Sequence, residues 1–289
     1  MRTRTGSFEI GIRRGWSDWQ KDLDGLIAWL KQNDFSVIDL GRDGDTLGKQ
    51  VTDAGMKIGS VDLAEWQGML SADPGKRKDA VARNVQYVND CAKVGAKNHF
   101  LVMLPEDASK PRAENFGYMV QSLNMLAPDL ERVDAKLVIE GWPGPGALCC
   151  TPESYRACFK ECPSNSIGIN YDPSHLLRMG IDPVRFAHEF GDRVFHAHGK
   201  DTEIIDEALY EFGTEQPATF GKAHGFGSHH WRYTIPGHGQ VRWTEALRAL
   251  ESHGYKGFVS IELEDENFNG SEAGEKDGFR LGAQFLSGC

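Results

Sequence analysis

The chain has 289 residues, of which 40% are hydrophobic and 26% are charged, a composition typical of a soluble globular protein. Its 32 basic and 42 acidic residues give a net charge of −10, which disfavours nucleic acid as a partner, because that binding depends on basic side chains neutralising phosphates. The sequence shows no apolar run of about 18 residues, no signal-peptide pattern and no CxxC pair among its six cysteines, so we expect a cytoplasmic protein with reduced thiols that binds no membrane.

Short apolar runs alternate with segments of helical periodicity along the whole chain. In the first helical segment, for example, Leu23, Ile27 and Leu30 recur at helical spacing. The predicted strands cover residues 8–12, 35–40, 56–63, 99–104, 136–140, 167–172, 194–201 and 258–262. The predicted helices cover residues 16–31, 41–55, 74–94, 112–133 and 277–286, with others that begin near Thr151 and Trp243.

Eight strands that alternate with helices over 289 residues predict a (β/α)₈ TIM barrel, formed by one domain over residues 1–289. A doubly wound open sheet is the main competing fold. It is disfavoured because no GxGxxG motif follows an early strand.

Four of the predicted strands end in residues that bind metal ions. Glu140, Asp172 and Glu262 close three of them, and His198 lies near the end of the strand in the segment 194–201. Because the carboxyl ends of parallel strands meet at one end of a barrel, we expect these side chains to converge. Three carboxylates and one imidazole predict a site for Mn²⁺, Mg²⁺ or Co²⁺ more than a closed zinc site.

One connection is much longer than the others. Residues 203–240 are rich in glycine, histidine and aromatic residues, and they separate the seventh strand from the next helix. Long loops in compact domains are usually functional or disordered, and this one is too aromatic for disorder. We therefore expect a partly ordered lid over the site.

The second half of the chain resembles a known group of enzymes. The motifs are IEG at 139–141, YDPSH at 171–175, HAHGKDTEI at 196–204, WRYTIPGHGQVRW at 231–243 and GFVSIELED at 257–265. Together they resemble the xylose isomerase-like TIM-barrel superfamily, which includes sugar isomerases and epimerases, inosose dehydratases and type IV apurinic endonucleases. The first half resembles it only in the rhythm of strands and helices.

The resemblance implies one divalent metal ion, most often Mn²⁺, held by Glu140, Asp172, His198 and Glu262. The two glutamates would also be the catalytic acid and base, exchanging a proton through an enediolate that the metal stabilises. His175 and Lys200 would contact the substrate.

Other residues allow two interpretations at this stage. His196 is either a hydrogen-bonding neighbour of the site or part of the core, and Trp142 is either a wall of the site or plain packing. Arg232 binds either an anionic group of the substrate or a surface acid. Glu264 lies two residues beyond Glu262 on the same strand face, so it competes for the role of metal ligand.

The first functional hypothesis is a sugar isomerase or epimerase. A lyase or hydratase acting on a 3-keto-glycoside, or a keto-inositol dehydratase, would use the same chemistry. A sugar-binding barrel without catalysis is the alternative of another class. An endonuclease is disfavoured because the early strands supply only His99, at the amino end of its strand. The absence of a phosphate-binding motif favours a neutral sugar or glycoside, and a homo-oligomer is possible.

Overall fold

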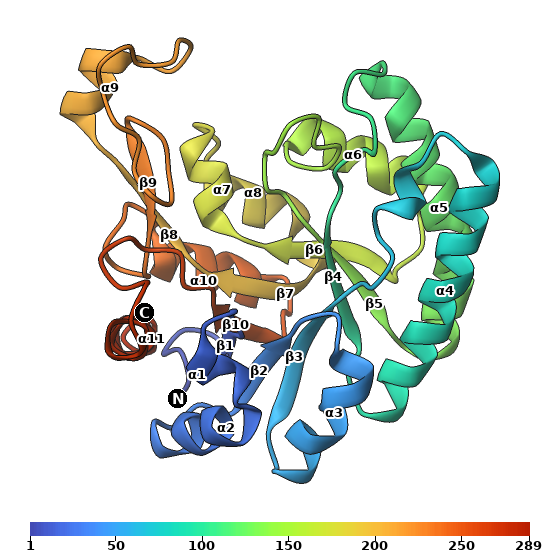
Figure 1. Cartoon of the computed structure of the whole chain (residues 1–289), viewed down its shortest axis with the longest axis horizontal. Helices are drawn as coiled ribbons and strands as arrows, with labels where there is room; N and C mark the ends of the chain where they lie inside the picture. Colours follow the sequence, from blue (N-terminus) through green and yellow to red (C-terminus); the bar gives the residue numbers. More distant parts are fainter. The chain divides into compact units, whose positions relative to one another are not determined.

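The structure, a computed structural model that describes residues 1–289, contains a closed barrel of eight strands (Figure 1). The strands neighbour one another in the order β1-β10-β7-β6-β5-β4-β3-β2, and the pairs along it are parallel. The predicted TIM barrel is confirmed. The barrel strands are β1 (Glu9–Arg13), β2 (Val37–Leu40), β3 (Lys57–Asp62), β4 (Asn98–Val102), β5 (Lys136–Glu140), β6 (Ile167–Tyr171), β7 (Val194–Gly199) and β10 (Phe258–Ile261).

The helices follow the predicted alternation, with some differences, among them α9 (Asp206–Phe212) within the long connection that was predicted as a loop. The segment predicted as one helix over 16–31 is two helices, because Asp22 interrupts it and caps the second through Gly25 N. Two short helices after β6 were not predicted, and the last helix begins earlier than expected. The helices are α1 (Asp18–Lys21), α2 (Leu23–Gln32), α3 (Gly44–Asp53), α4 (Pro74–Lys93), α5 (Arg112–Arg132), α6 (Pro152–Glu161), α7 (Pro173–Arg178), α8 (Pro183–Phe190), α9 (Asp206–Phe212), α10 (Trp243–Ser252) and α11 (Glu272–Ser287). No helix among them has the length and apolarity needed to cross a membrane.

The residues form two compact units. One contains residues 38–171 and 192–197, and the other contains residues 1–37, 172–191 and 198–289. In the first unit, β3, β4, β5 and β6 pair in sequence, and α4 and α5 pack side by side (Figure 1). In the second, β1 pairs with β10, and α8 packs against α10. Each unit therefore buries the apolar face of its own strands under its own helices.

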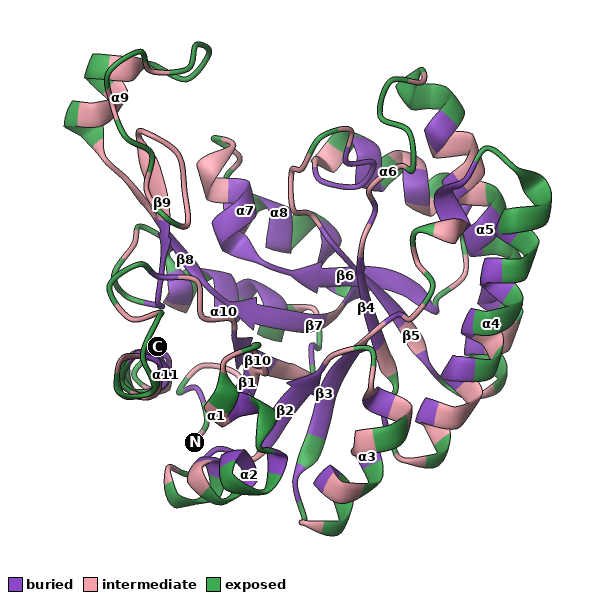
Figure 2. Ribbon diagram, viewed as in Figure 1, coloured by how far each residue is buried: buried purple, intermediate pink, exposed green.

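The barrel strands are buried, whereas the long connection after β7 is not uniformly so (Figure 2). It begins with β8 (Asp201–Ile204), which pairs antiparallel with β9 (Trp231–Thr234). Thr202, Tyr233 and Thr234 at the base of this hairpin are buried, but α9 between the two strands buries no residue. The predicted loop at 203–240 is therefore a hairpin with a buried base and an exposed outer part, and its role as a lid stays a prediction.

Asp201 fixes the base of the hairpin. Its buried carboxylate accepts hydrogen bonds from the backbone N–H groups of Thr202, Gly237 and Val241 at 2.8–3.1 Å, and from Trp243 Nε1 at 3.0 Å. Burial raises the pKa of Asp201, and these donors oppose that shift. A Cβ atom at Gly239 would lie 2.2 Å from the Asp201 carboxylate, so only glycine allows this close approach. Asp201 thus holds both ends of the connection together.

Candidate metal centre and active site

Asp172 follows β6 and is the N-cap of α7. Its Oδ1 accepts hydrogen bonds from Ser174 N at 2.9 Å and from Ser174 Oγ at 2.6 Å. Its Oδ2 instead lies 3.3 Å from His175 Nε2 and 3.3 Å from Lys200 Nζ. The cap therefore orients the carboxylate, because it engages one oxygen and directs the other toward the end of the barrel.

Lys200 lies directly after β7 and is 1% exposed. Its ammonium donates hydrogen bonds to Glu262 Oε2 at 2.5 Å and to Glu264 Oε2 at 3.0 Å. Burial of an ammonium is costly unless acceptors and negative charges surround it, and these carboxylates supply both. Glu264 thus contacts Lys200, the candidate substrate-binding residue, from the solvent side.

Glu262 follows β10 and is surrounded by positive charge. Arg13 Nε at the end of β1 lies 3.1 Å from its Oε1, and His198 Nδ1 lies 3.4 Å from its Oε2. Burial by itself would raise the pKa of Glu262, but Lys200 first, then His198 and Arg13, hold it well below the ordinary value. Glu262 is therefore an oriented carboxylate anion at neutral pH.

Glu140 ends β5, is buried, and accepts a hydrogen bond from a neutral amide. The parallel register places it beside Asn170 of β6, whose Nδ2 donates a 2.7 Å hydrogen bond to Glu140 Oε2. Tyr155 on α6 donates to the carbonyl oxygen of the preceding residue, Ile139, at 3.0 Å. These contacts fix the end of β5 and one oxygen of the Glu140 carboxylate.

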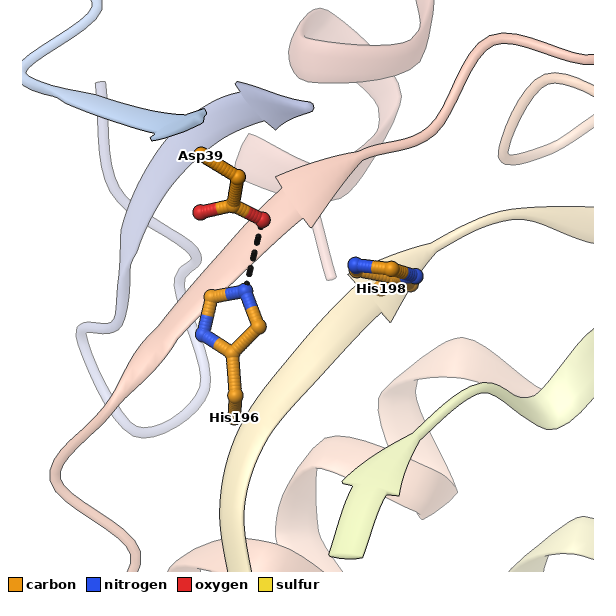
Figure 3. A group of neighbouring side chains, drawn as sticks. All are labelled: Asp39, His196 and His198. Carbon is orange, nitrogen blue, oxygen red and sulfur yellow. Dashed lines mark hydrogen bonds and ion pairs between the residues drawn. The ribbon is translucent and has the colours of Figure 1, made fainter. Parts of the chain in front are cut away.

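His196 and His198 lie two residues apart on β7, and Asp39 is the partner of His196 (Figure 3). Its Nε2 lies 2.8 Å from Oδ2 of Asp39 on β2, and both side chains are fully buried. Asp39 Oδ1 in turn accepts a hydrogen bond from Ser60 N at 3.0 Å. The pair supports the interpretation of His196 as a buried hydrogen-bonding residue, and its contact with substrate stays a prediction.

Glu140, Asp172, His198 and Glu262 each offer a ligand atom, and these atoms all lie within 4.8 Å of one another. Three carboxylates and one imidazole are a hard donor set, which suits Mn²⁺, Mg²⁺ or Co²⁺. The cluster can therefore hold a divalent metal ion. The identity of that ion stays a prediction.

The other predicted substrate-binding residues lie in different surroundings. His175 is buried on α7 beside Asp172, and Trp142 is half-buried in the loop after β5. Arg232 lies across the hairpin from Glu203 and contacts its carboxylate at 2.7 Å, with Asp265 at 3.4 Å. These acids support the second interpretation of Arg232, that it binds an acidic side chain.

Three residues of the site were not predicted from the sequence. Asn170 lies two residues before Asp172 on the same strand face, so the alternation along β6 places it near Glu140. Arg13 ends the first strand, and a charged residue at that position also indicates the active-site end of a barrel. Tyr233 gives no such pattern, because only the hairpin brings it to His175.

Comparison with known proteins identifies the family of the chain. The profile of the xylose isomerase-like TIM barrel family matches residues 22–289. An inosose dehydratase from Geobacillus kaustophilus is 25% identical over 260 residues, which cover 84% of this chain and 80% of the relative. The uncharacterized protein YfiH from Bacillus subtilis is 36% identical over 107 residues, 34% of this chain and 31% of the relative. The matches to YfiH and to several other inosose dehydratases span half or less of those relatives.

Solved structures show the same fold. The 3-keto-D-glucoside 4-epimerase YcjR from E. coli superposes with a TM-score of 0.71 at 13% identity, covering 98% of this chain and 100% of that chain. A D-psicose 3-epimerase from Clostridium cellulolyticum, determined with D-tagatose, gives a TM-score of 0.72 at 15% identity, covering 97% and 100%. The family profile covers far more than half of the sequence, and the closed barrel agrees with it. The chain therefore belongs to the xylose isomerase-like TIM-barrel family.

Proposed function

We propose that the chain is a divalent-metal-dependent sugar isomerase or epimerase. The observation that carries this proposal is the cluster of Glu140, Asp172, His198 and Glu262, whose ligand atoms lie within 4.8 Å of one another. When bound there, a divalent cation would acidify the C–H bond beside a sugar carbonyl by accepting the negative charge that deprotonation creates. Moving that proton between two faces of one carbon, or between two adjacent carbons, is the chemistry of this enzyme class.

The two glutamates are suited to move the proton. Asn170 holds one oxygen of Glu140 at 2.7 Å, and Arg13 and Lys200 hold the two oxygens of Glu262 at 3.1 and 2.5 Å. Fixed carboxylates cost little reorganisation when the substrate reacts. The Lys200 ammonium, bound to Glu262, can donate to a sugar oxygen and so orient the substrate. The catalytic roles of Glu140 and Glu262, and substrate contacts by His175 and Lys200, belong to this proposal.

A lyase is the second candidate, and Lys200 favours it. Elimination beside a carbonyl needs an acid that protonates the departing oxygen, and a buried ammonium 2.5 Å from a carboxylate can supply that proton. Relatives named inosose dehydratase, one of which aligns over 84% of this chain, also support elimination. The substrate would then be a 3-keto-glycoside or a keto-inositol, and water or an aglycone would leave.

One experiment tests both candidates. The protein is stripped with a chelator, supplied with Mn²⁺, and incubated in D₂O with ketohexoses, a 3-keto-glucoside and a keto-inositol. We expect metal-dependent incorporation of deuterium beside the carbonyl, with mass otherwise conserved for an isomerase or epimerase. Loss of water or of the aglycone identifies the lyase instead.

The matched control is Glu266→Gln, because Glu266 is a glutamate that accepts hydrogen bonds from Gly225 N and His224 outside the cluster. The Glu266→Gln variant should incorporate deuterium into the substrate at the wild-type rate. Exchange that persists in full without metal would refute the metal-dependent mechanism. Sugar binding without exchange on any substrate, with or without metal, would favour a binding barrel.

A further inference from the structure

Tyr233 lies at the base of the β8–β9 hairpin and connects this insertion to the candidate active site. It pairs across the hairpin with Thr202 and is 4% exposed. Thr202 Oγ1 donates a 2.9 Å hydrogen bond to the carbonyl oxygen of Ser174 on α7. The backbone that carries Tyr233 is therefore fixed against the helix that follows Asp172.

Tyr233 makes two different contacts with residues of the site. Its hydroxyl oxygen lies 2.6 Å from Nδ1 of His175, and its ring centroid lies 4.6 Å from Nζ of Lys200. An ammonium over the face of an aromatic ring is attracted by the negative charge of that face. His175 and Lys200 in turn both lie 3.3 Å from Oδ2 of Asp172. One side chain thus contacts both groups that face the same carboxylate oxygen.

The contact between Tyr233 and His175 is a short hydrogen bond between two buried side chains. The Tyr233 hydroxyl oxygen and His175 Nδ1 lie 2.6 Å apart, and which of them donates depends on which ring nitrogen carries the proton. Burial raises the pKa of Tyr233, which is consistent with a hydroxyl that keeps its proton.

We infer that Tyr233 is a positioning residue, which fixes the orientation of the His175 ring through its hydroxyl and the location of the Lys200 ammonium through its ring. This inference deepens the proposed function and rests on it for the role of Lys200 and His175 in substrate binding. Partners that orient the groups around a metal site typically change affinity or activity by about 10- to 100-fold when removed. The insertion is then a structural part of the active site.

Two substitutions separate the contacts. Tyr233→Phe removes the hydroxyl and keeps the ring, whereas Tyr233→Leu removes both. Tyr255→Phe is the matched control, because Tyr255 is also buried and donates a 2.6 Å hydrogen bond, but to the carbonyl oxygen of Phe258. Thermal unfolding of each variant checks that it is folded.

The first readout needs no substrate. Histidine is labelled with ¹⁵N, and the ring nitrogens of His175 are assigned by comparison with His175→Gln. We expect the Nδ1 resonance of His175 to shift in Tyr233→Phe and in Tyr233→Leu, and to stay in place in Tyr255→Phe. Unchanged His175 resonances in a folded Tyr233→Phe protein would overturn the inference, whether or not the protein turns over a sugar.

The second readout is kinetic. We expect kcat to fall by about tenfold in Tyr233→Phe and further, to about 100-fold, in Tyr233→Leu, with activity unchanged in Tyr255→Phe. The inference would be overturned if the wild type is active and Tyr233→Phe and Tyr233→Leu have the same kcat as the wild type. Inactivity of the wild type on every sugar tested would refute the proposed function alone, since the His175 resonances still decide the inference.

Discussion

Glu140 and Glu262 lie at the ends of two strands of the same barrel, yet different contacts hold the two carboxylates. Asn170, a neutral amide, donates to Glu140, whereas Arg13 and Lys200 place positive charge beside Glu262. Cations stabilise a carboxylate anion more strongly than a neutral donor does, so Glu262 has little tendency to take up a proton. We therefore propose that Glu140 removes the substrate proton and that the pair of Glu262 and Lys200 returns a proton.

The largest effects should come from removing either carboxylate. We expect Glu140→Gln and Glu262→Gln each to lower kcat by about 10²- to 10⁴-fold, the usual contribution of a positioned acid or base, with the fold intact by circular dichroism. Steady-state kinetics measures this loss. Retained activity in either variant would refute the assignment of that residue.

Exchange with D₂O then separates the two roles. Glu140→Gln should lose exchange of the substrate proton, because no group removes it, whereas Glu262→Gln should keep part of that exchange while product formation stops. Equal loss of exchange in both variants would contradict the proposal that Glu140 removes the proton and Glu262 returns it.

A smaller effect should follow from removing the positive charge beside Glu262. In Lys200→Met, Asp172 and Glu262 lose a buried cation, and breaking such a pair costs about 3 kcal/mol of unfolding free energy. Saturating Mn²⁺ should restore part of this stability, since a ligand that binds only the folded state stabilises it. Urea unfolding with chelator and with Mn²⁺ measures both values; a variant as stable as wild type in chelator would contradict the buried-charge argument.

The smallest effect should come from the neutral partner of Glu140. Asn170→Ala removes one hydrogen bond to a charged group, worth roughly 1.5 kcal/mol, which corresponds to about a tenfold decrease in kcat. Asn98→Ala is the control, because Asn98 lies at the amino end of β4, away from the cluster, and donates at 2.9 Å to the carbonyl oxygen of Gly59 on β3. If both variants lose activity equally, the contact with Glu140 has no special role.

The sequence by itself determined the barrel and the four residues that converge at the ends of its strands. Strand and helix periodicities are local properties, and a parallel barrel brings the carboxyl ends of its strands together, so Glu140, Asp172, His198 and Glu262 could be named without coordinates. The prediction failed where a single residue changes the local structure. Asp22 divides the first helix by capping the second.

Only the tertiary structure decided which groups surround each carboxylate. Arg13 and Glu262 are far apart in the sequence, and the pairing of β1 with β10 brings them to 3.1 Å. Tyr233 reaches His175 because Asp201 anchors a hairpin whose length and composition gave no sign of its register. Contacts of this kind depend on strand register and on single buried hydrogen bonds, which leave no periodic pattern in the chain.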